Sequence, residues 1–287
     1  MAAGGAFSYG VTIICNRRLA LLGFGPQATL SIRFGVSALV LFGLLAVLRR
    51  GMVPARRERL RLLLLGAVGY AVESALFYSA LQRGTAAAVA LLFYVYPAIV
   101  TVIELAAGRT VFSKQLLGAL ALSITGTALV VASGGDVSIS RTGVLFALGS
   151  AVTFAIYLLA SGRAVTRSDP IVNGAWVAAG ASLSLTVQGL ATGGLRNPGA
   201  DAWLMVANGV ATASAFSLLF AALGRLGASR TAVVMTLEAA SAVVLAAVLL
   251  GESISVVQLV GGAAILAATV LISTSKILSP IEVDEAP

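Results

Sequence analysis

Two glutamates stand inside long uncharged stretches, where a carboxylate could carry a proton or a positive charge through an apolar medium. Glu238 lies about ten residues, and Glu73 about thirteen residues, into runs long enough to cross a membrane as helices. A charged group near the centre of a bilayer costs several kcal/mol, so such a residue is usually functional. A protonated or paired glutamate with a structural role is the alternative. We predict that Glu238, or else Glu73, changes its protonation or its partner as the protein works.

Aromatic and polar side chains recur at helical spacing near these glutamates and could contact a small amphipathic molecule. Serines and threonines in membrane helices often bond only to helix backbone, and single tyrosines often anchor a helix at the interface, so a structural role is the alternative. Pro97 removes a backbone donor, and we predict that it kinks its helix and acts as a gate hinge. The predicted ligand-contacting residues are Asn16, Phe77, Tyr78, Tyr94, Thr153, Tyr157, Asn208, Met235 and Glu238.

Residue types that the chain lacks narrow the chemistry. It has no histidine and one cysteine, Cys15. This excludes a histidine-based zinc site, a Ser-His-Asp triad and an intramolecular disulfide. The remaining carboxylates are scattered and assemble no nucleophile and base, so an intramembrane enzyme lacks its machinery, and we expect no cofactor and no metal. A receptor or scaffold that transports nothing is the other alternative.

The composition is that of a membrane protein. Apolar residues make up 59% of the 287 residues and charged residues 10%, with a mean hydropathy of +1.01. Uncharged runs of about 20 residues or more recur, which as helices span a ~30 Å hydrocarbon core. The runs are apolar on all sides, unlike the alternating strands of a barrel, and a helix satisfies its own backbone in lipid. They lie at 84–103, 115–135, 142–162, 170–195, 202–224 and 253–275.

Clusters of glycine, proline, asparagine and aspartate separate the apolar runs and mark loops. We therefore predict an all-α membrane protein. Its ten transmembrane helices are expected at 3–22, 27–48, 60–82, 84–107, 113–133, 142–163, 170–192, 201–224, 228–250 and 254–275.

The chain carries one unit twice. After 142 positions, Ala80, Leu81, Arg83, Ala86 and Ala90 recur as Ala222, Leu223, Arg225, Ala228 and Ala232. After 143 positions, Gly108, Gln115, Leu116, Gly118 and Ala121 recur as Gly251, Gln258, Leu259, Gly261 and Ala264. Five helices per copy is an odd number, so we predict two inverted five-helix repeats. The first spans 1–137 and the second 138–279, followed by a short cytoplasmic tail at 280–287.

Basic residues gather in alternate loops. If the N-terminus is cytoplasmic, thirteen of the 19 lysines and arginines lie on the cytoplasmic side, as the positive-inside rule requires. The net charge of +8 then reflects orientation in a membrane and not nucleic-acid binding, and both termini are predicted to be cytoplasmic. Arg33 lies near the outer end of its helix, where a long side chain can reach the interface. The thirteen are Arg49, Arg50, Arg56, Arg57, Arg59, Arg61, Arg109, Lys114, Arg163, Arg167, Arg225, Arg230 and Lys276.

Several motifs resemble the EamA repeat of the drug/metabolite transporter superfamily, and the likeness spans nearly the whole chain, once per half. The motifs are Arg33-Phe34, Tyr96-Pro97, Leu250-Gly251-Glu252 and Gln258-Leu259-x-Gly261. The chain departs from the family pattern at Tyr9-Gly10 (usually Trp-Gly), at Glu238-Ala239 (usually Glu-Pro) and at Arg109 (often Glu). These departures bear on the substrate more than on the fold.

The resemblance implies ten helices, alternating access and export of small organic solutes. Within the family the chain looks most like the bacterial aromatic amino acid exporters. This implies export of amino acids, aromatic or more broadly neutral, across the bacterial inner membrane. Export of drugs, or transport of another small metabolite, is the alternative. The expected partners are then a small-molecule substrate and the lipid bilayer, with no nucleic acid and no metal, and a monomer is preferred.

Overall fold

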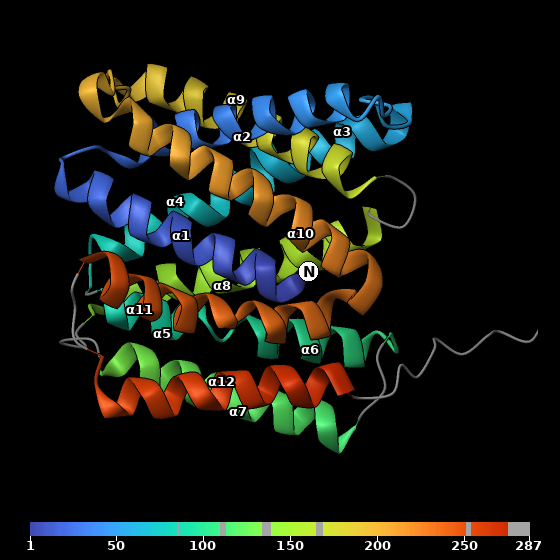
Figure 1. Cartoon of the computed structure of the whole chain (residues 1–287), viewed down its shortest axis with the longest axis vertical. Coiled ribbons are helices and arrows are strands. Elements are labelled where there is room, and N and C mark those ends of the chain that lie inside the picture. Colours follow the sequence, from blue (N-terminus) through green and yellow to red (C-terminus); the bar gives the residue numbers. More distant parts are fainter. Residues whose placement is uncertain (85, 110–112, 134–138, 165–168, 251–253, 275–287) are drawn as a thin grey trace, which may run out of the picture.

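The protein is a bundle of helices in the computed structural model, which describes residues 1–84, 86–109, 113–133, 139–164, 169–250 and 254–274 (Figure 1). Within these residues, strand pairing is limited to one bridge between Gly84 and Ile139. The α-helices are α1 (Ala2–Leu21), α2 (Pro26–Val47), α3 (Arg56–Leu64), α4 (Ala71–Leu81), α5 (Ala86–Phe93), α6 (Tyr96–Ala106), α7 (Lys114–Ala132), α8 (Arg141–Ala164), α9 (Pro170–Thr192), α10 (Ala202–Met235), α11 (Leu237–Leu250) and α12 (Val256–Thr274). A π-helical segment, η1 (Leu65–Tyr70), joins α3 to α4, and a 3₁₀ turn, η3 (Gly199–Asp201), precedes α10.

Seven helical segments of the described chain are long and apolar enough to cross a membrane, and two shorter apolar helices accompany them. The predicted all-helical, multi-pass membrane protein is therefore confirmed. The seven segments are Pro26–Val47, Arg56–Phe77, Ala88–Ala106, Lys114–Ala132, Arg141–Arg163, Pro170–Thr192 and Gly199–Met235, and the shorter helices are Leu237–Leu249 and Val256–Ile272.

Some predicted helices differ from the observed ones. The predicted helix 84–107 is interrupted at Tyr94 and Val95, and Pro97 lies in the first turn of α6, where its missing N–H costs no hydrogen bond. The loop predicted after residue 224 is instead a kink at Gly227 (φ 74°), and helical structure continues to Met235. A glycine tolerates this left-handed conformation, so the chain can turn without ending the helix.

Helices that correspond in the two sequence copies pack against each other in opposite directions. In the α2–α9 pair, Gln27 lies beside Gly189 and Leu41 beside Gly174. In the α7–α12 pair, Gly118 lies beside Leu271, and Gly126 beside Gly261. The residue numbers rise along one helix as they fall along its partner, so each pair is antiparallel.

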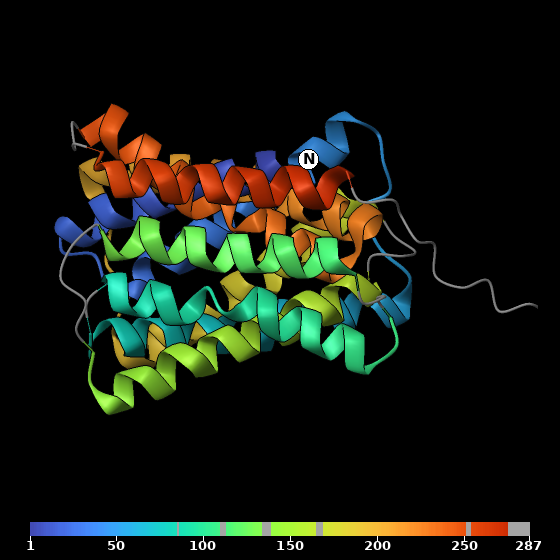
Figure 2. The same ribbon diagram turned by 90° about the horizontal axis from the view of Figure 1, so that it is seen from below.

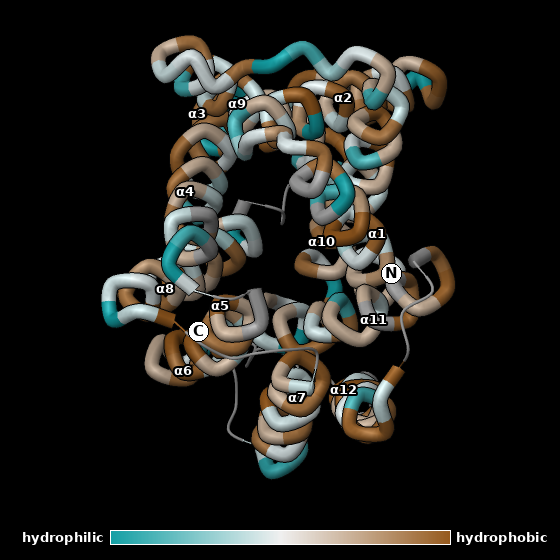
Figure 3. The backbone as a smooth tube through the Cα atoms, turned by 90° about the vertical axis from the view of Figure 1, so that its left-hand side faces the viewer, coloured by the Kyte–Doolittle hydropathy of each residue, from teal (hydrophilic) through white to brown (hydrophobic). Residues whose placement is uncertain are grey.

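The other helices lie between these two pairs, as the view along the helices shows (Figure 3). On one side α4 packs on α8, and on the other α1 packs on α10 and α11. In the sequence repeat α1 corresponds to α8, and α4 to the first half of α10. The α4–α8 contact therefore has its counterpart in the α1–α10 contact. The antiparallel α7–α12 pair is also visible from below (Figure 2).

Two glycines allow α9 to cross the junction of α3 and η1 at close range. A Cβ on Gly66, in η1, would meet the backbone oxygen of Val177 on α9, and a Cβ on Gly180 would meet the backbone oxygen of Leu63. Both distances are far inside van der Waals contact. Backbone atoms cannot rotate away as a side chain can, so a methyl group here must push the two helices apart.

Gly66→Ala should therefore destabilise the protein by about 1–3 kcal/mol, the usual cost of overpacking. The matched control is Gly43→Ala, because a Cβ on Gly43 meets nothing within 4 Å. Removing a glycine from a helix interior there should stabilise the fold by about 0.5–1 kcal/mol. Thermal unfolding of the purified variants in detergent measures both effects. Equal melting temperatures for the two variants would contradict the crossing.

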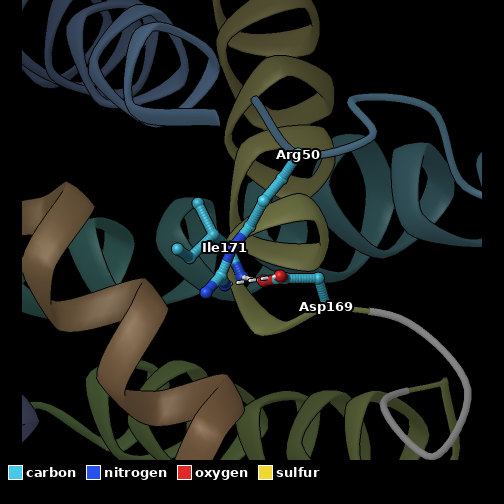
Figure 4. A network of polar contacts seen from close by, with 3 residues as sticks. All are labelled: Arg50, Asp169 and Ile171. Carbon is cyan, nitrogen blue, oxygen red and sulfur yellow. Dashed lines mark hydrogen bonds and ion pairs between the residues drawn. The ribbon is translucent and has the colours of Figure 1, made fainter. Parts of the chain in front are cut away.

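One end of the bundle carries Arg49, Arg50, Arg56 and Arg57 and is called the arginine end below. Here Arg50 forms an ion pair with Asp169 at 2.8 Å, and the other oxygen of Asp169 accepts a hydrogen bond from the Ile171 N–H at 2.8 Å (Figure 4). Asp169 is the N-cap of α9. The contact ties the α2–α3 connection of the first copy to the second copy.

Candidate functional site

Two helices are broken at corresponding positions of the two copies. In the first copy Tyr94 and Val95 separate α5 from α6, and in the second copy Thr236 separates α10 from α11. Tyr94 and Thr236 are 142 positions apart, which is the repeat offset. Paired interruptions of this kind are the best pointer to a transporter binding site, because broken helices expose backbone and polar groups at membrane depth.

A network of aromatic rings surrounds these breaks. Tyr70 is at its centre, with ring centroids 5.1 Å from Phe34, 5.3 Å from Tyr157 and 5.4 Å from Phe216. Phe154 stacks on Tyr157 at 5.9 Å and continues the network to Tyr96 and Phe93. The rings come from η1, α2, α5, α6, α8 and α10, so both copies contribute.

Glu73 is buried beside this network, and both of its oxygens have donors. The hydroxyl of Ser74 donates to Oε2 at 3.2 Å, and the hydroxyl of Ser150 donates to Oε1 at 3.1 Å. Ser150 lies on α8, in the other copy. Two neutral donors can hold this carboxylate without a counter-charge in contact, so Glu73 links α4 to α8.

Glu238 lies in the first turn of α11, directly after the break at Thr236, and is partly buried. Among the described residues, none donates a hydrogen bond to its carboxylate. It interacts electrostatically with Arg33 and Glu73, and with the hydroxyls of Tyr94 and Tyr96. Glu238 is therefore a carboxylate at the aromatic network that still has free hydrogen-bonding capacity.

Arg33 was not among the predicted site residues, yet it lies at this site. Its side chain is only 6% exposed, and the guanidinium carbon lies 4.5 Å from the Phe34 ring centre. The Arg33 side chain therefore does not extend to the membrane interface, which was the expectation from its position near the helix end. Its charge acts on Glu73, Glu238 and Tyr70. An arginine inside an apolar run is as costly as a glutamate there, and this signal could have grouped it with Glu73 and Glu238.

The structure also brings together the predicted residues Asn16 and Asn208. The Asn208 amide donates to the Asn16 side-chain oxygen at 2.7 Å and joins α10 to α1. Gly209, the next residue, packs against the backbone of Arg33, which places this amide pair beside α2. The side-chain oxygen of Asn208 itself has no donor in the described part of the chain.

Other predicted residues lie differently. Tyr94 and Tyr157 are buried in the aromatic network, and Met235 is buried in the core next to the second break. Phe77 packs edge-on against Phe93 at the margin of the network. The Thr153 hydroxyl donates to the backbone oxygen of Gly149 on its own helix, so this residue has the structural role given above as the alternative to ligand contact. The side chain of Tyr78 lies outside the described part of the structure.

A polar vestibule opens at the end of the bundle opposite the arginine end. It is a cavity of about 250 Å³, and its polar wall consists of Gln27, Gln82, Gln188, Ser74 and Ser79. The apolar lining includes Leu30, one helical turn from Arg33, and Ser74 is the residue that donates to Glu73. The vestibule therefore leads from the surface toward the buried charges.

At the arginine end, contacts between the two copies close the bundle. The carboxylate of Glu104 on α6 accepts hydrogen bonds from the backbone N–H (3.0 Å) and the hydroxyl of Ser229, just after the kink at Gly227. Deeper in the bundle, at the helix breaks, the Tyr96 hydroxyl donates to the Ala232 backbone oxygen at 3.5 Å, and the Ser123 hydroxyl donates to the Thr236 hydroxyl at 3.0 Å. The charged and aromatic site is thus approached by a cavity from one end and covered by polar contacts at the other.

A duplicated bundle of apolar helices, with paired helix breaks around buried charges, is the architecture of a membrane transporter. The model of the EamA-like transporter family matches the chain twice, at residues 1–132 and 141–274. The chain therefore belongs to the EamA-like transporter family.

Comparison with solved structures agrees on the fold. In all, 29 chains of solved structures match this chain. One, described as the crystal structure of a protein, aligns with a TM-score of 0.77 at 17% identity and covers 94% of this chain and 98% of its own. At this identity the likeness concerns the fold alone. No curated protein matches the chain.

Proposed function

We propose that this membrane transporter of the drug/metabolite superfamily is a secondary transporter that exports amino acids, aromatic ones preferred, by alternating access across the bacterial inner membrane. The observation that carries the proposal is the pair of helix breaks, 142 positions apart, beside Arg33, Glu73 and Glu238. Aromatic rings with a few charged groups suit an amphipathic ligand. Export of drugs or of another small metabolite is the alternative function, since an aromatic cavity also accepts such molecules.

Alternating access is supported by the antiparallel packing of corresponding helices. We infer ten membrane crossings in two inverted copies, with helices 1–5 from α1 to α7 and helices 6–10 from α8 to α12. Inverted copies can exchange conformations, which would move the opening from the vestibule to the arginine end around a fixed site. The break before Pro97 and the kink at Gly227 are the proposed hinges, because backbone angles change most easily where helices are interrupted.

Coupling is proposed to run through Glu238, or else Glu73. Both carboxylates lie where the two copies meet, and Arg33 is the cation whose charge acts on both. A protonated carboxylate and a charged one interact differently with this arginine, so protonation can bias the two conformations. The protein then needs no cofactor and no metal, and we propose that it works as a monomer.

Counterflow in proteoliposomes tests the proposed function. Vesicles loaded with unlabelled phenylalanine should accumulate labelled phenylalanine from outside, and a panel of amino acids should rank aromatic or large neutral side chains first. Protein-free vesicles are the control. Counterflow of cationic drugs, with none of any amino acid, would favour the alternative function.

The proposed orientation puts the arginine end in the cytoplasm and the vestibule outside. Val53 and Leu195 are exposed near opposite ends. In a Cys15→Ser background, an impermeant thiol reagent applied to intact cells should label Leu195→Cys and spare Val53→Cys until the cells are lysed. Both positions should react in lysed cells, which controls for accessibility. Labelling of Val53→Cys in intact cells would reverse the orientation.

A further inference from the structure

We infer that Arg33 and Glu238 recognise the two charges of a zwitterion: the guanidinium binds a carboxylate, and the Glu238 carboxylate accepts hydrogen bonds from an ammonium. The inference rests on the proposed function and specifies how the ligand is recognised. The ligand class is a free α-amino acid with an apolar or aromatic side chain.

The first argument is the unused capacity of Arg33. Its Nε is buried without a hydrogen-bond partner, and among the described residues no carboxylate lies within 4.0 Å of its guanidinium. A buried cation without a paired anion is unfavourable, so the arrangement favours binding of an anion. The planar fork of a guanidinium matches the two oxygens of a carboxylate.

The second argument is the contrast between the two glutamates. Glu73 accepts from Ser74 and Ser150 and is satisfied within the protein. Glu238 accepts no hydrogen bond from the described residues. It is partly buried and follows a helix break, so part of its side chain remains accessible. An ammonium group would supply this carboxylate with up to three hydrogen-bond donors and with a positive counter-charge.

The third argument is the spacing of the two charges. Arg33 and Glu238 interact electrostatically but do not form an ion pair with each other. The carboxylate and the ammonium of an amino acid are joined by one carbon, so both can be placed between two opposite charges that are near but not in contact. Tyr94 and Tyr96 also interact electrostatically with Glu238, so aromatic residues lie near this carboxylate.

The vestibule fits a ligand of this size. Its volume of about 250 Å³ lies below the roughly 300–1,000 Å³ of pockets for drug-sized molecules. Glutamine and serine side chains in its wall can solvate a zwitterion on the way in. Leu30 in its lining is on the same face of α2 as Arg33, one turn away.

The test is counterflow with three labelled compounds that share the benzyl side chain and differ in their charged groups: phenylalanine, phenethylamine, which lacks the carboxylate, and N-acetylphenylalanine, in which an acetyl group removes the charge of the ammonium. The wild-type protein should prefer phenylalanine by about tenfold or more, the worth of one charge-assisted hydrogen bond. Arg33→Gln should lose the preference over phenethylamine and keep the preference over N-acetylphenylalanine. Glu238→Gln should show the opposite pattern.

The matched controls are Arg56→Gln and Glu58→Gln, which remove the same charges from the start of α3 and should leave both preferences unchanged. Ligand-induced thermal shifts in detergent provide a readout of binding that does not need transport and also show that each variant is folded. If the wild-type protein transports phenethylamine as fast as phenylalanine, the proposed recognition of a zwitterion is wrong, while the proposed transport function still stands. Absence of counterflow for every amino acid would overturn the proposed substrate, and the inference with it.

Discussion

Glu238→Gln is expected to reduce transport driven by an imposed pH gradient to the level seen without a gradient. Glutamine keeps the shape of the side chain but cannot take up or release a proton at neutral pH, whereas the Glu238 carboxylate can and interacts electrostatically with the buried Arg33. The Glu238→Gln substitution should leave the amount of folded protein in the membrane unchanged. The measurement is substrate accumulation in proteoliposomes with and without a pH step.

Glu58→Gln is the matched control, because Glu58 lies in the first turn of α3 at the arginine end and not among the buried charges. It should respond to the pH step as the wild-type protein does. Glu73→Gln distinguishes the two candidate coupling residues. If only this variant loses the response of transport to the pH step, the coupling role belongs to Glu73. If the pH dependence is unchanged in both Glu238→Gln and Glu73→Gln, facilitated diffusion is the better account.

Glu104→Ala is expected to open the arginine end. The Glu104 carboxylate accepts both donors of Ser229 and so caps the helix that restarts after Gly227. Loss of a helix N-cap costs about 1–2 kcal/mol, and if that contact exists only in the closed state the open population should rise about 5–30-fold. The alkylation rate of a cysteine at the buried residue Thr231, in a Cys15→Ser background, measures this opening.

Ser229→Ala provides a graded comparison, because it removes the hydroxyl donor and keeps the backbone N–H. It should increase the alkylation rate less than Glu104→Ala does. A cysteine at Leu195, on the vestibule end, should react at the wild-type rate in both variants. An unchanged rate at Thr231→Cys in Glu104→Ala would mean that other contacts, such as the ion pair between Arg50 and Asp169, hold this end closed.

The helical membrane fold could be predicted because it depends on local signals. Apolar runs of sufficient length must form helices in lipid, and turn residues separate them. The helix breaks could not be predicted so well. Pro97 gave a signal for the first break, but the second falls at Thr236, before Ala239, where the family usually has proline. The Thr236 hydroxyl donates to the Val233 backbone oxygen, which is a local contact, and accepts from Ser123 on α7, which is a tertiary contact. The tertiary contact cannot be read from the local sequence.

The candidate site was predicted in part. The glutamates were found because a charge in an apolar run is costly wherever the chain folds. Asn16 and Asn208 were chosen by helical spacing, and the structure brings them into contact. Arg33 was missed because its distance from the helix end suggested an interfacial side chain. Its actual burial depends on Phe34 and on the packing of α10 against α2, which helical spacing alone does not reveal.

The antiparallel pairing of corresponding helices has an evolutionary consequence. The α2 and α7 surfaces of the first copy each pack on their own counterparts, α9 and α12, in the opposite direction. A single ancestor of half this length, inserted in both orientations, could therefore have built the same bundle as a homodimer. Duplication and fusion of its gene would then have freed each half to acquire its own features. Arginines could accumulate in loops that face one side, and Glu238 could arise in only one copy.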